Sequence, residues 1–229
     1  MAAFEGFPAD FFAFLEELAQ NNNREWFQEN KPRYQASIVA PVGEFITALA
    51  PGLQEISPYY LADARPHGGS MFRIYRDTRF ARDKAPYKTH VACHFRHEAG
   101  RDAHAPGFYA HFEPSGLYLG GGIWLPPSDH LGRIREAICD NANEWGKLKS
   151  APAVRARGGI GGDGLKRPPR GYDPDHEHVE DLKRKSYFVM TEAPADLARG
   201  ASLLPETLKA FRAAARLNHF ICHALELPF

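Results

Sequence analysis

The stretch GFYAHFEPSGLYLGGGIW, residues 107–124, constrains the fold most because it predicts a β-hairpin. The segment Glu113-Pro114-Ser115-Gly116 separates residues 107–112 from residues 117–124, and its composition favours a tight turn. The glycine run 120–122 weakens the second strand, and such glycines mark a bulge or a group that approaches the backbone closely. The chain therefore contains at least one antiparallel pair of strands.

Further strands and helices surround this hairpin. Alternating side chains predict strands over residues 71–75, 90–95 and 186–191. Apolar residues at helical spacing predict helices over residues 8–20, from 23, over 33–50, from 128, near 176–184 and from 205. Pro41 should kink or split the third of these helices. The pattern predicts an α+β fold, with a mainly antiparallel sheet flanked by N-terminal helices and a C-terminal helix.

The length of 229 residues predicts a single domain that spans residues 1–229. Within it we expect a helical N-terminal region over residues 1–52 and a sheet-containing region over residues 53–229. Apolar residues make up 44% of the chain, enough for a sizeable core. The 28 Lys and Arg residues balance 28 Asp and Glu residues, unlike a generic basic nucleic-acid coat protein. Any anion-binding site must therefore be local.

Cysteine usage and the N-terminus predict a cytoplasmic protein that does not contact a membrane. Cys93, Cys139 and Cys222 are far apart and form no C-x-x-C motif, which predicts reduced thiols. The N-terminal residues have neither the basic region nor the apolar core of a signal peptide, and no charge-free stretch approaches the length of a membrane span.

The segment FRIYRDTRFARDKAPYK, residues 72–88, concentrates positive charge in a chain with no net charge. Asp77 and Asp83 could neutralise some of it, and solvated charge runs of this kind are common on protein surfaces. An external anion is the alternative, because arginine binds phosphate and carboxylate groups through two hydrogen bonds. Apolar residues interleaved with the charges would fix the basic groups to a packed scaffold, which favours the anion. We expect the ligand-binding side chains Arg73, Arg76, Arg79, Lys84, Tyr87 and Lys88.

A second basic segment, residues 155–170, has the glycines of a phosphate-binding loop but not its chemistry. Leu165 stands where the P-loop lysine belongs, and no Ser or Thr follows. The segment therefore predicts a flexible basic loop, from which Lys166 and Arg167, together with Lys185, could close over the same ligand.

Residues 171–187 combine acids, histidines and bases around a short predicted helix. Acids before a helix and bases at its end complement the helix dipole, which accounts for the pattern without chemistry. Alternatively, Asp175 and His176 form an acid–base pair, and they are the candidate catalytic residues if a reaction occurs. No nucleophile motif accompanies them.

Histidine pairs give no metal prediction. His90 and His94 share one face of a predicted strand, and His219 and His223 share one face of the last helix. Neither pair has an obvious third ligand, so we predict no metal site, and the cofactor is unknown.

Several motifs give the chain an identity. FRIYRDTRFARDKAPYKTH at 72–90 resembles the F-R-I-Y-R-D-x-R-F-x-x-D-K-x-P-Y-K signature of an uncharacterised bacterial and fungal domain-of-unknown-function family. The resemblance extends to FLEELAQNNNREWF (14–27), GFYAHFEPSGLYLGGGIWLP (107–126), LKRPPRGYDPDH (165–176) and LKRKSY (182–187). It implies one domain of this length and carries over no activity, cofactor or catalytic residue.

Three functional hypotheses follow. The first is a pocket for an anionic small molecule, with phosphate the expected group. The second is a non-catalytic module that binds single-stranded nucleic acid or a protein through basic and aromatic side chains. The third is structural, with the basic segment forming a buried ion-pair network. The sequence does not decide whether the protein is an enzyme.

Overall fold

A four-stranded antiparallel sheet is the centre of the computed structural model, which describes residues 4–100 and 104–229. The strands are β1 (Val91–Arg96), β2 (Gly107–Glu113), β3 (Gly116–Ile123) and β4 (Tyr187–Ala193), and they lie in the order β1-β2-β3-β4. The predicted hairpin is β2 and β3, which join through the predicted turn. The α+β prediction is confirmed.

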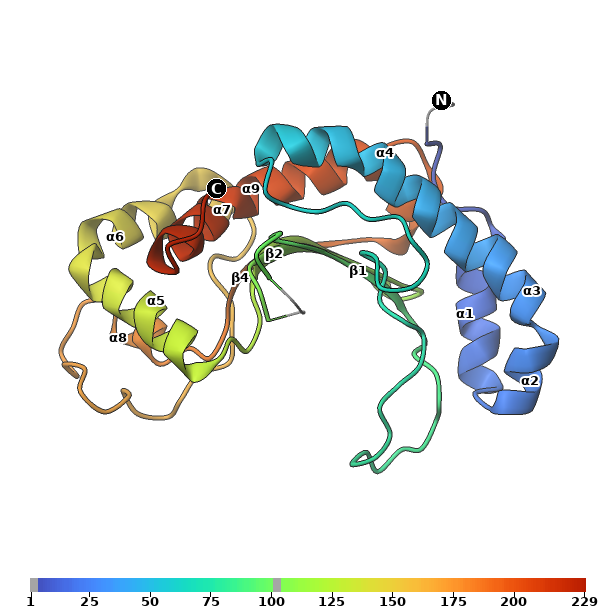
Figure 1. Cartoon of the computed structure of the whole chain (residues 1–229), viewed down its shortest axis with the longest axis horizontal. Helices are drawn as coiled ribbons and strands as arrows, with labels where there is room; N and C mark the ends of the chain where they lie inside the picture. Colours follow the sequence, from blue (N-terminus) through green and yellow to red (C-terminus); the bar gives the residue numbers. More distant parts are fainter. Residues whose placement is uncertain (1–3, 101–103) are drawn as a thin grey trace.

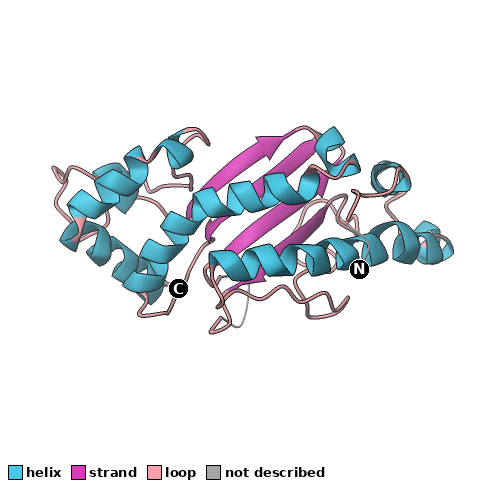
Figure 2. Ribbon diagram, turned by 90° about the horizontal axis from the view of Figure 1, so that it is seen from above, coloured by secondary structure: helices cyan, strands magenta, loops and turns pink. Residues whose placement is uncertain are grey.

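Two long helices cover one face of the sheet. Helices α4 (Ala40–Ile56) and α9 (Leu203–Ala224) lie side by side across the strands (Figure 2). The strands bury every second residue against them: Phe108 and Phe112 of β2 face this core, with Phe211 of α9 stacked on Phe108 at 5.0 Å between ring centroids. Because successive side chains of a strand point to opposite faces of the sheet, the residues between these lie on the face away from α4 and α9.

The last of the N-terminal helices continues into α4 as one element. Helices α1 (Asp10–Gln20), α2 (Arg24–Glu29) and α3 (Lys31–Tyr34) precede a π-helical turn over Gln35–Val39, which leads directly into α4. Because Pro41 has no N–H to donate, the widened turn before it accommodates the proline without ending the helix. The prediction of an end near residue 50 is wrong, since the helix runs through Pro51 to Ile56.

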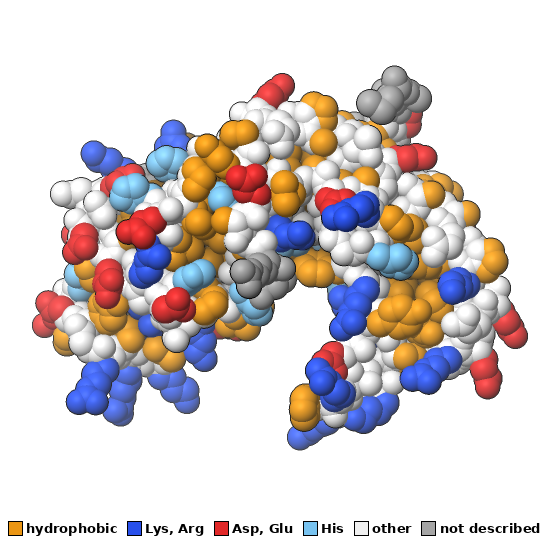
Figure 3. Space-filling model, viewed as in Figure 1, with side chains coloured by type: hydrophobic (Ala, Val, Ile, Leu, Met, Phe, Trp, Pro, Cys, Tyr) orange, Lys and Arg blue, Asp and Glu red, His pale blue; other side chains and the backbone are white. Residues whose placement is uncertain are grey.

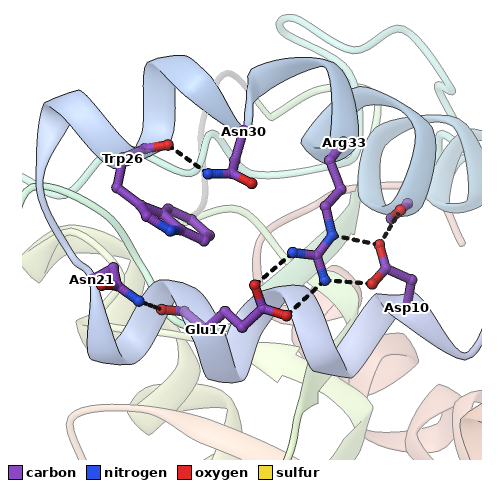
Figure 4. A network of polar contacts seen from close by, with 7 residues as sticks. Asp10, Glu17, Asn21, Trp26, Asn30 and Arg33 are labelled. Atoms are coloured by element: carbon purple, nitrogen blue, oxygen red, sulfur yellow. Dashed lines mark hydrogen bonds and ion pairs between the residues drawn. The ribbon is translucent and has the colours of Figure 1, made fainter.

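The continuous helix over residues 31–56 is long and apolar enough to cross a membrane by length and composition, a test that the core helices of soluble proteins also pass. A polar clamp holds its start against α1 (Figure 4). Arg33 donates to both carboxylate oxygens of Asp10, at 2.8 and 2.5 Å, and to Glu17 at 2.6 Å. These bonds lower the pKa values of both acids.

The predicted strand over residues 71–75 is wrong as a regular strand. The segment runs beside β1 through only a few bonds, with Phe72 N donating to Ala92 O and His94 N donating to Ser70 O. It then leaves the sheet and pairs with its own continuation through the Tyr75–Tyr87 bridge. Residues 76–86 consequently form a loop that projects from the sheet (Figure 1).

A helical subregion fills the crossover between β3 and β4. It contains α5 (Ser128–Asp140), α6 (Ala142–Ser150), α7 (Pro152–Arg155) and α8 (Val179–Leu182), and a 3₁₀ turn over Ala195–Arg199 follows β4. The flexible basic loop predicted over residues 155–170 follows α7, and the helix predicted near 176–184 is only the short α8. Buried Asp181 ties this region together by accepting hydrogen bonds from Trp145 and Arg184 and pairing with Lys149 at 2.7 Å.

Candidate functional site

The face of the sheet opposite α4 and α9 is hollowed. In Figure 1 the sheet arches over an open space, and Figure 3 shows the hollow with Lys and Arg side chains on both of its flanks. The hollow contains a cavity of about 380 Å³. Aromatic side chains form much of its wall: Phe72, Tyr109, Trp124 and Phe188.

Strand alternation places the polar groups of this cavity. Val91 and Cys93 of β1 face the core, so His90 and His94 point to the opposite face, where both line the cavity. Gly107 leaves the space that the His94 ring occupies, since a Cβ atom there would collide with the ring.

Lys88 supplies the positive charge of the cavity wall. Its Nζ atom lies 5.3 Å from the centroid of the Phe72 ring. Burial, and then the charge of Arg73, lower the pKa of Lys88. Within residues 4–100 and 104–229, no carboxylate forms an ion pair with this ammonium group. The cavity therefore contains a partly desolvated cation that the described chain does not neutralise.

A cluster of His90, His111 and Glu113 lies beside the cavity. The rings of His90 and His111 stack with centroids 4.4 Å apart, and His111 Nε2 lies 3.2 Å from Glu113 Oε2. Tyr109 Oη, which belongs to the cavity wall, lies 3.1 Å from His111 Nδ1. Ser115 donates a 2.5 Å hydrogen bond to Glu113 Oε1.

Burial and neighbouring charges set the protonation of this cluster. Burial, followed by the charges of His111 and Lys88, lowers the pKa of His90 to about 4, so its imidazole is neutral at pH 7. The hydrogen bond from Ser115 holds the pKa of Glu113 below its usual range. Burial raises the pKa of Tyr109 to about 12, which keeps its hydroxyl protonated. At pH 7 the cluster therefore combines the neutral imidazole of His90, the carboxylate of Glu113 and the protonated hydroxyl of Tyr109.

Two of the four predicted arginines, Arg76 and Arg79, lie on the loop over residues 76–86, where they have partners of their own. Arg76 pairs with Asp83 at 2.5 Å, and Arg79 pairs with Asp77 at 2.6 Å. Lys84 donates to the carbonyl of Thr78, and Arg73 is exposed at the base of the loop. These pairs are exposed, with the Arg79 side chain 77% accessible, and do not form a buried ion-pair network.

Tyr87 has a packing role. It is buried, and its ring stacks on Phe27 of α2 at 4.1 Å between centroids. Its backbone N–H and carbonyl are both hydrogen-bonded by the side chain of Asn22. These contacts fix the segment that carries Lys88, the next residue, against the helical region of the molecule.

The other predicted residues lie across the hollow, in the crossover region. Lys166, Arg167 and Lys185 are exposed, and the backbone N–H of Lys185 donates to Asp163. Asp175 is exposed, and His176 accepts a hydrogen bond at Nδ1 from the backbone of His178. The structure does not bring these residues into the wall of the cavity around Lys88.

Sequence reasoning missed Tyr109, His111, Glu113 and Trp124. The first three alternate with Phe108, Ala110 and Phe112, and this pattern alone places them on the face opposite the core. Their proximity to His90 depends on the register between β1 and β2, which pairs Val91 with Phe112.

Comparison with known proteins identifies the family. No curated protein and no solved structure matches the chain. The model of a family of conserved hypothetical proteins, DUF2461, matches residues 10–220, which include the β-sheet, the Lys88 segment and most of α9. The chain therefore belongs to the DUF2461 family of conserved hypothetical proteins.

Proposed function

We propose that this protein binds an anionic small molecule in the cavity on the open face of its sheet, in the cytoplasm. The ligand carries a phosphate or carboxylate group beside Lys88 and a flat apolar body between the aromatic walls. The observation that carries the proposal is the Lys88 ammonium, which lines the cavity without a carboxylate partner among the described residues.

An unpaired ammonium in a partly buried wall favours an anion. Removing a charge from water is costly unless an opposite charge or hydrogen bonds compensate for it. The cation–π contact with Phe72 offsets only part of this cost. A ligand oxyanion would replace the lost hydration with a charge-assisted hydrogen bond, which contributes about 1.5–3 kcal/mol.

The aromatic walls specify the remainder of the ligand. Phe72, Tyr109, Trp124 and Phe188 present apolar rings to the cavity. Ligand sites commonly combine such walls with a few polar groups that fix the orientation. The basic side chains on both flanks would raise the local concentration of an anion before it reaches Lys88. Asp175 and His176, which do not line the cavity, have no role in this proposal.

Calorimetry with 1-naphthyl phosphate and 1-naphthol tests the proposal, with a chelator present to exclude metal-mediated binding. We expect the wild type to prefer the phosphate, and Lys88→Met to weaken phosphate binding about tenfold or more. Lys209→Met is the matched control, because Lys209 is exposed on α9, on the covered side of the sheet. Equal affinities for the two compounds, or unchanged binding in Lys88→Met, would refute the proposal.

A second candidate function rests on Phe80, in the loop over residues 76–86. Its side chain is 95% exposed, and its ring centroid lies 5.9 Å from the guanidinium of Arg79. An exposed ring among cations suits stacking with a base of single-stranded nucleic acid. The affinity for an oligonucleotide should then fall steeply as salt is added, with the logarithm of the affinity linear in the logarithm of the salt concentration. Phe80→Ala should also reduce this affinity. No oligonucleotide binding at low salt would eliminate this candidate.

A further inference from the structure

We infer that His90, His111 and Glu113 bind a divalent transition-metal ion at the edge of the cavity. Their nearest ligand atoms all lie within 4.8 Å of one another. Two imidazoles and one carboxylate form a known ligand set for catalytic zinc, and also for ferrous iron, and both arrangements leave coordination positions open. This site extends the proposed function but does not depend on it.

The geometry requires one small movement. Metal–ligand bonds of about 2.0–2.2 Å place neighbouring ligand atoms about 3.4 Å apart. His111 Nε2 and Glu113 Oε2, at 3.2 Å, already have this separation. Rotation of the His90 ring about its side-chain bonds, away from its stack on His111, would close the remaining gap. This rotation involves no backbone bond, so it does not disturb the pairing of β1 with β2.

His111 has the hydrogen bonding expected of a metal ligand. Ligating histidines usually use their second nitrogen for a hydrogen bond, which fixes the orientation of the ring. In the tautomer with a proton on Nδ1, His111 donates to Tyr109 Oη and directs the Nε2 lone pair toward Glu113 and His90. This Nε2 atom is buried, and its contact with Glu113 Oε2 at 3.2 Å lacks hydrogen-bond geometry. A buried nitrogen without a well-aligned hydrogen bond is costly, and coordination of an ion shared with Glu113 would satisfy it.

Glu113 is oriented in the same manner. Ser115, in the turn between β2 and β3, donates to Oε1 and leaves Oε2 directed at His111. The tight turn therefore positions both the ligand and the residue that orients it. A bound ion would also be close to the cavity, because His90 and Tyr109 belong to its wall. Its open positions could accept water or an oxygen of the ligand.

Titration of chelator-treated protein with Zn²⁺ alone tests the inference. We expect one equivalent to bind, and Glu113→Gln and His111→Ala each to weaken the affinity at least tenfold, which is roughly the effect of losing even an outer-shell partner. Tyr109→Phe keeps all three ligands and should weaken binding about tenfold through the loss of orientation. Co²⁺ should give the visible absorption of a four- or five-coordinate nitrogen–oxygen site in the wild type and lose it in Glu113→Gln.

The matched control is His219→Ala/His223→Ala, which removes an exposed histidine pair on α9. It should bind Zn²⁺ as tightly as the wild type. Circular dichroism of the metal-free variants checks folding, and if His111→Ala fails to fold, Glu113→Gln and Tyr109→Phe still decide the outcome. Loss of binding only in the α9 variant, or wild-type affinity in Glu113→Gln, would overturn the inference. Neither result depends on whether the cavity binds 1-naphthyl phosphate.

Discussion

His111 Nε2 lies 3.2 Å from Oε2 of Glu113, two residues further along β2 on the same face of the sheet. His90 contributes the stacked second ring from the residue before β1. The contact between these segments joins the cavity wall to the hairpin turn. It also makes His90 sensitive to pH, because its ring is half-buried beside His111 and Lys88.

Stability should decrease as the pH falls from 6.5 to 4, owing to His90. The folded pKa of about 4 lies below the ordinary value of 6.5, so in this range the unfolded state binds a proton that the folded state does not. Between pH 7 and pH 5 the free energy of unfolding should fall by about 2 kcal/mol. Above pH 6.5 His90 is neutral in both states and causes no such loss. Urea unfolding in the presence of a chelator measures it, and His90→Gln should show a shallower slope. An identical slope would exclude His90 as the cause.

Two glycines of the sheet should respond differently to alanine. A Cβ atom at Gly107 meets the end of the His94 side chain, which can move, so Gly107→Ala should remain folded while the wall of the cavity changes. A Cβ at Gly122 meets the backbone of Tyr187 in β4, and its φ of +150° is unfavourable for alanine. Gly122→Ala should therefore cost more than about 1 kcal/mol. Thermal unfolding of both variants measures the difference, and equal losses would contradict this assignment.

The glycine run and the hairpin are features of the fold that local sequence patterns predict correctly. The predicted close approach to the run is the backbone of β4, and the turn and alternation of β2 and β3 follow from residues adjacent in sequence. The helical stripe of α9, predicted as Leu208, Phe211, Leu217 and Ile221, was predictable for the same reason. Its last three residues are buried, whereas Leu208 is only partly buried.

The site was less predictable because it depends on contacts between distant segments. His90 contacts His111 only because of the register between β1 and β2. The density of positive charge instead favoured Arg76 and Arg79 as ligand-binding residues, but these arginines pair with nearby aspartates on an exposed loop. Lys88 was in the predicted set, but its position in the wall depends on Tyr87 packing against α2. Pairing partners and packing of this kind are tertiary properties that a linear pattern does not contain.

Asp181 should be a major determinant of stability in the crossover region. Burial raises the pKa of Asp181, but its bonds with Lys149, Trp145 and Arg184 outweigh this effect and leave it lowered. Asp181→Ala removes the shared partner of these groups and should cost about 3 kcal/mol. Glu180→Ala, beside it on α8 but exposed, should cost about 0.5 kcal/mol or less. Urea denaturation compares them, and similar losses would contradict a central role for Asp181.

The loop over residues 76–86 should contribute less to anion binding than Lys88 does. Arg76 and Arg79 are already paired with aspartates, so the Arg76→Ala/Arg79→Ala variant loses mainly long-range attraction. Its affinity for 1-naphthyl phosphate should fall less than that of Lys88→Met, and the effect should disappear at high salt. A larger loss than that of Lys88→Met would move the site from the cavity to the loop.

A crystal structure of the protein with 1-naphthyl phosphate tests the central claim most directly. The account predicts a phosphate oxygen at about 2.7–2.9 Å from Nζ of Lys88, with the naphthyl ring among the aromatic walls near Phe72 and Trp124. A phosphate held instead by Arg79 or by Lys166, with the cavity beside Lys88 free of ligand, would contradict it.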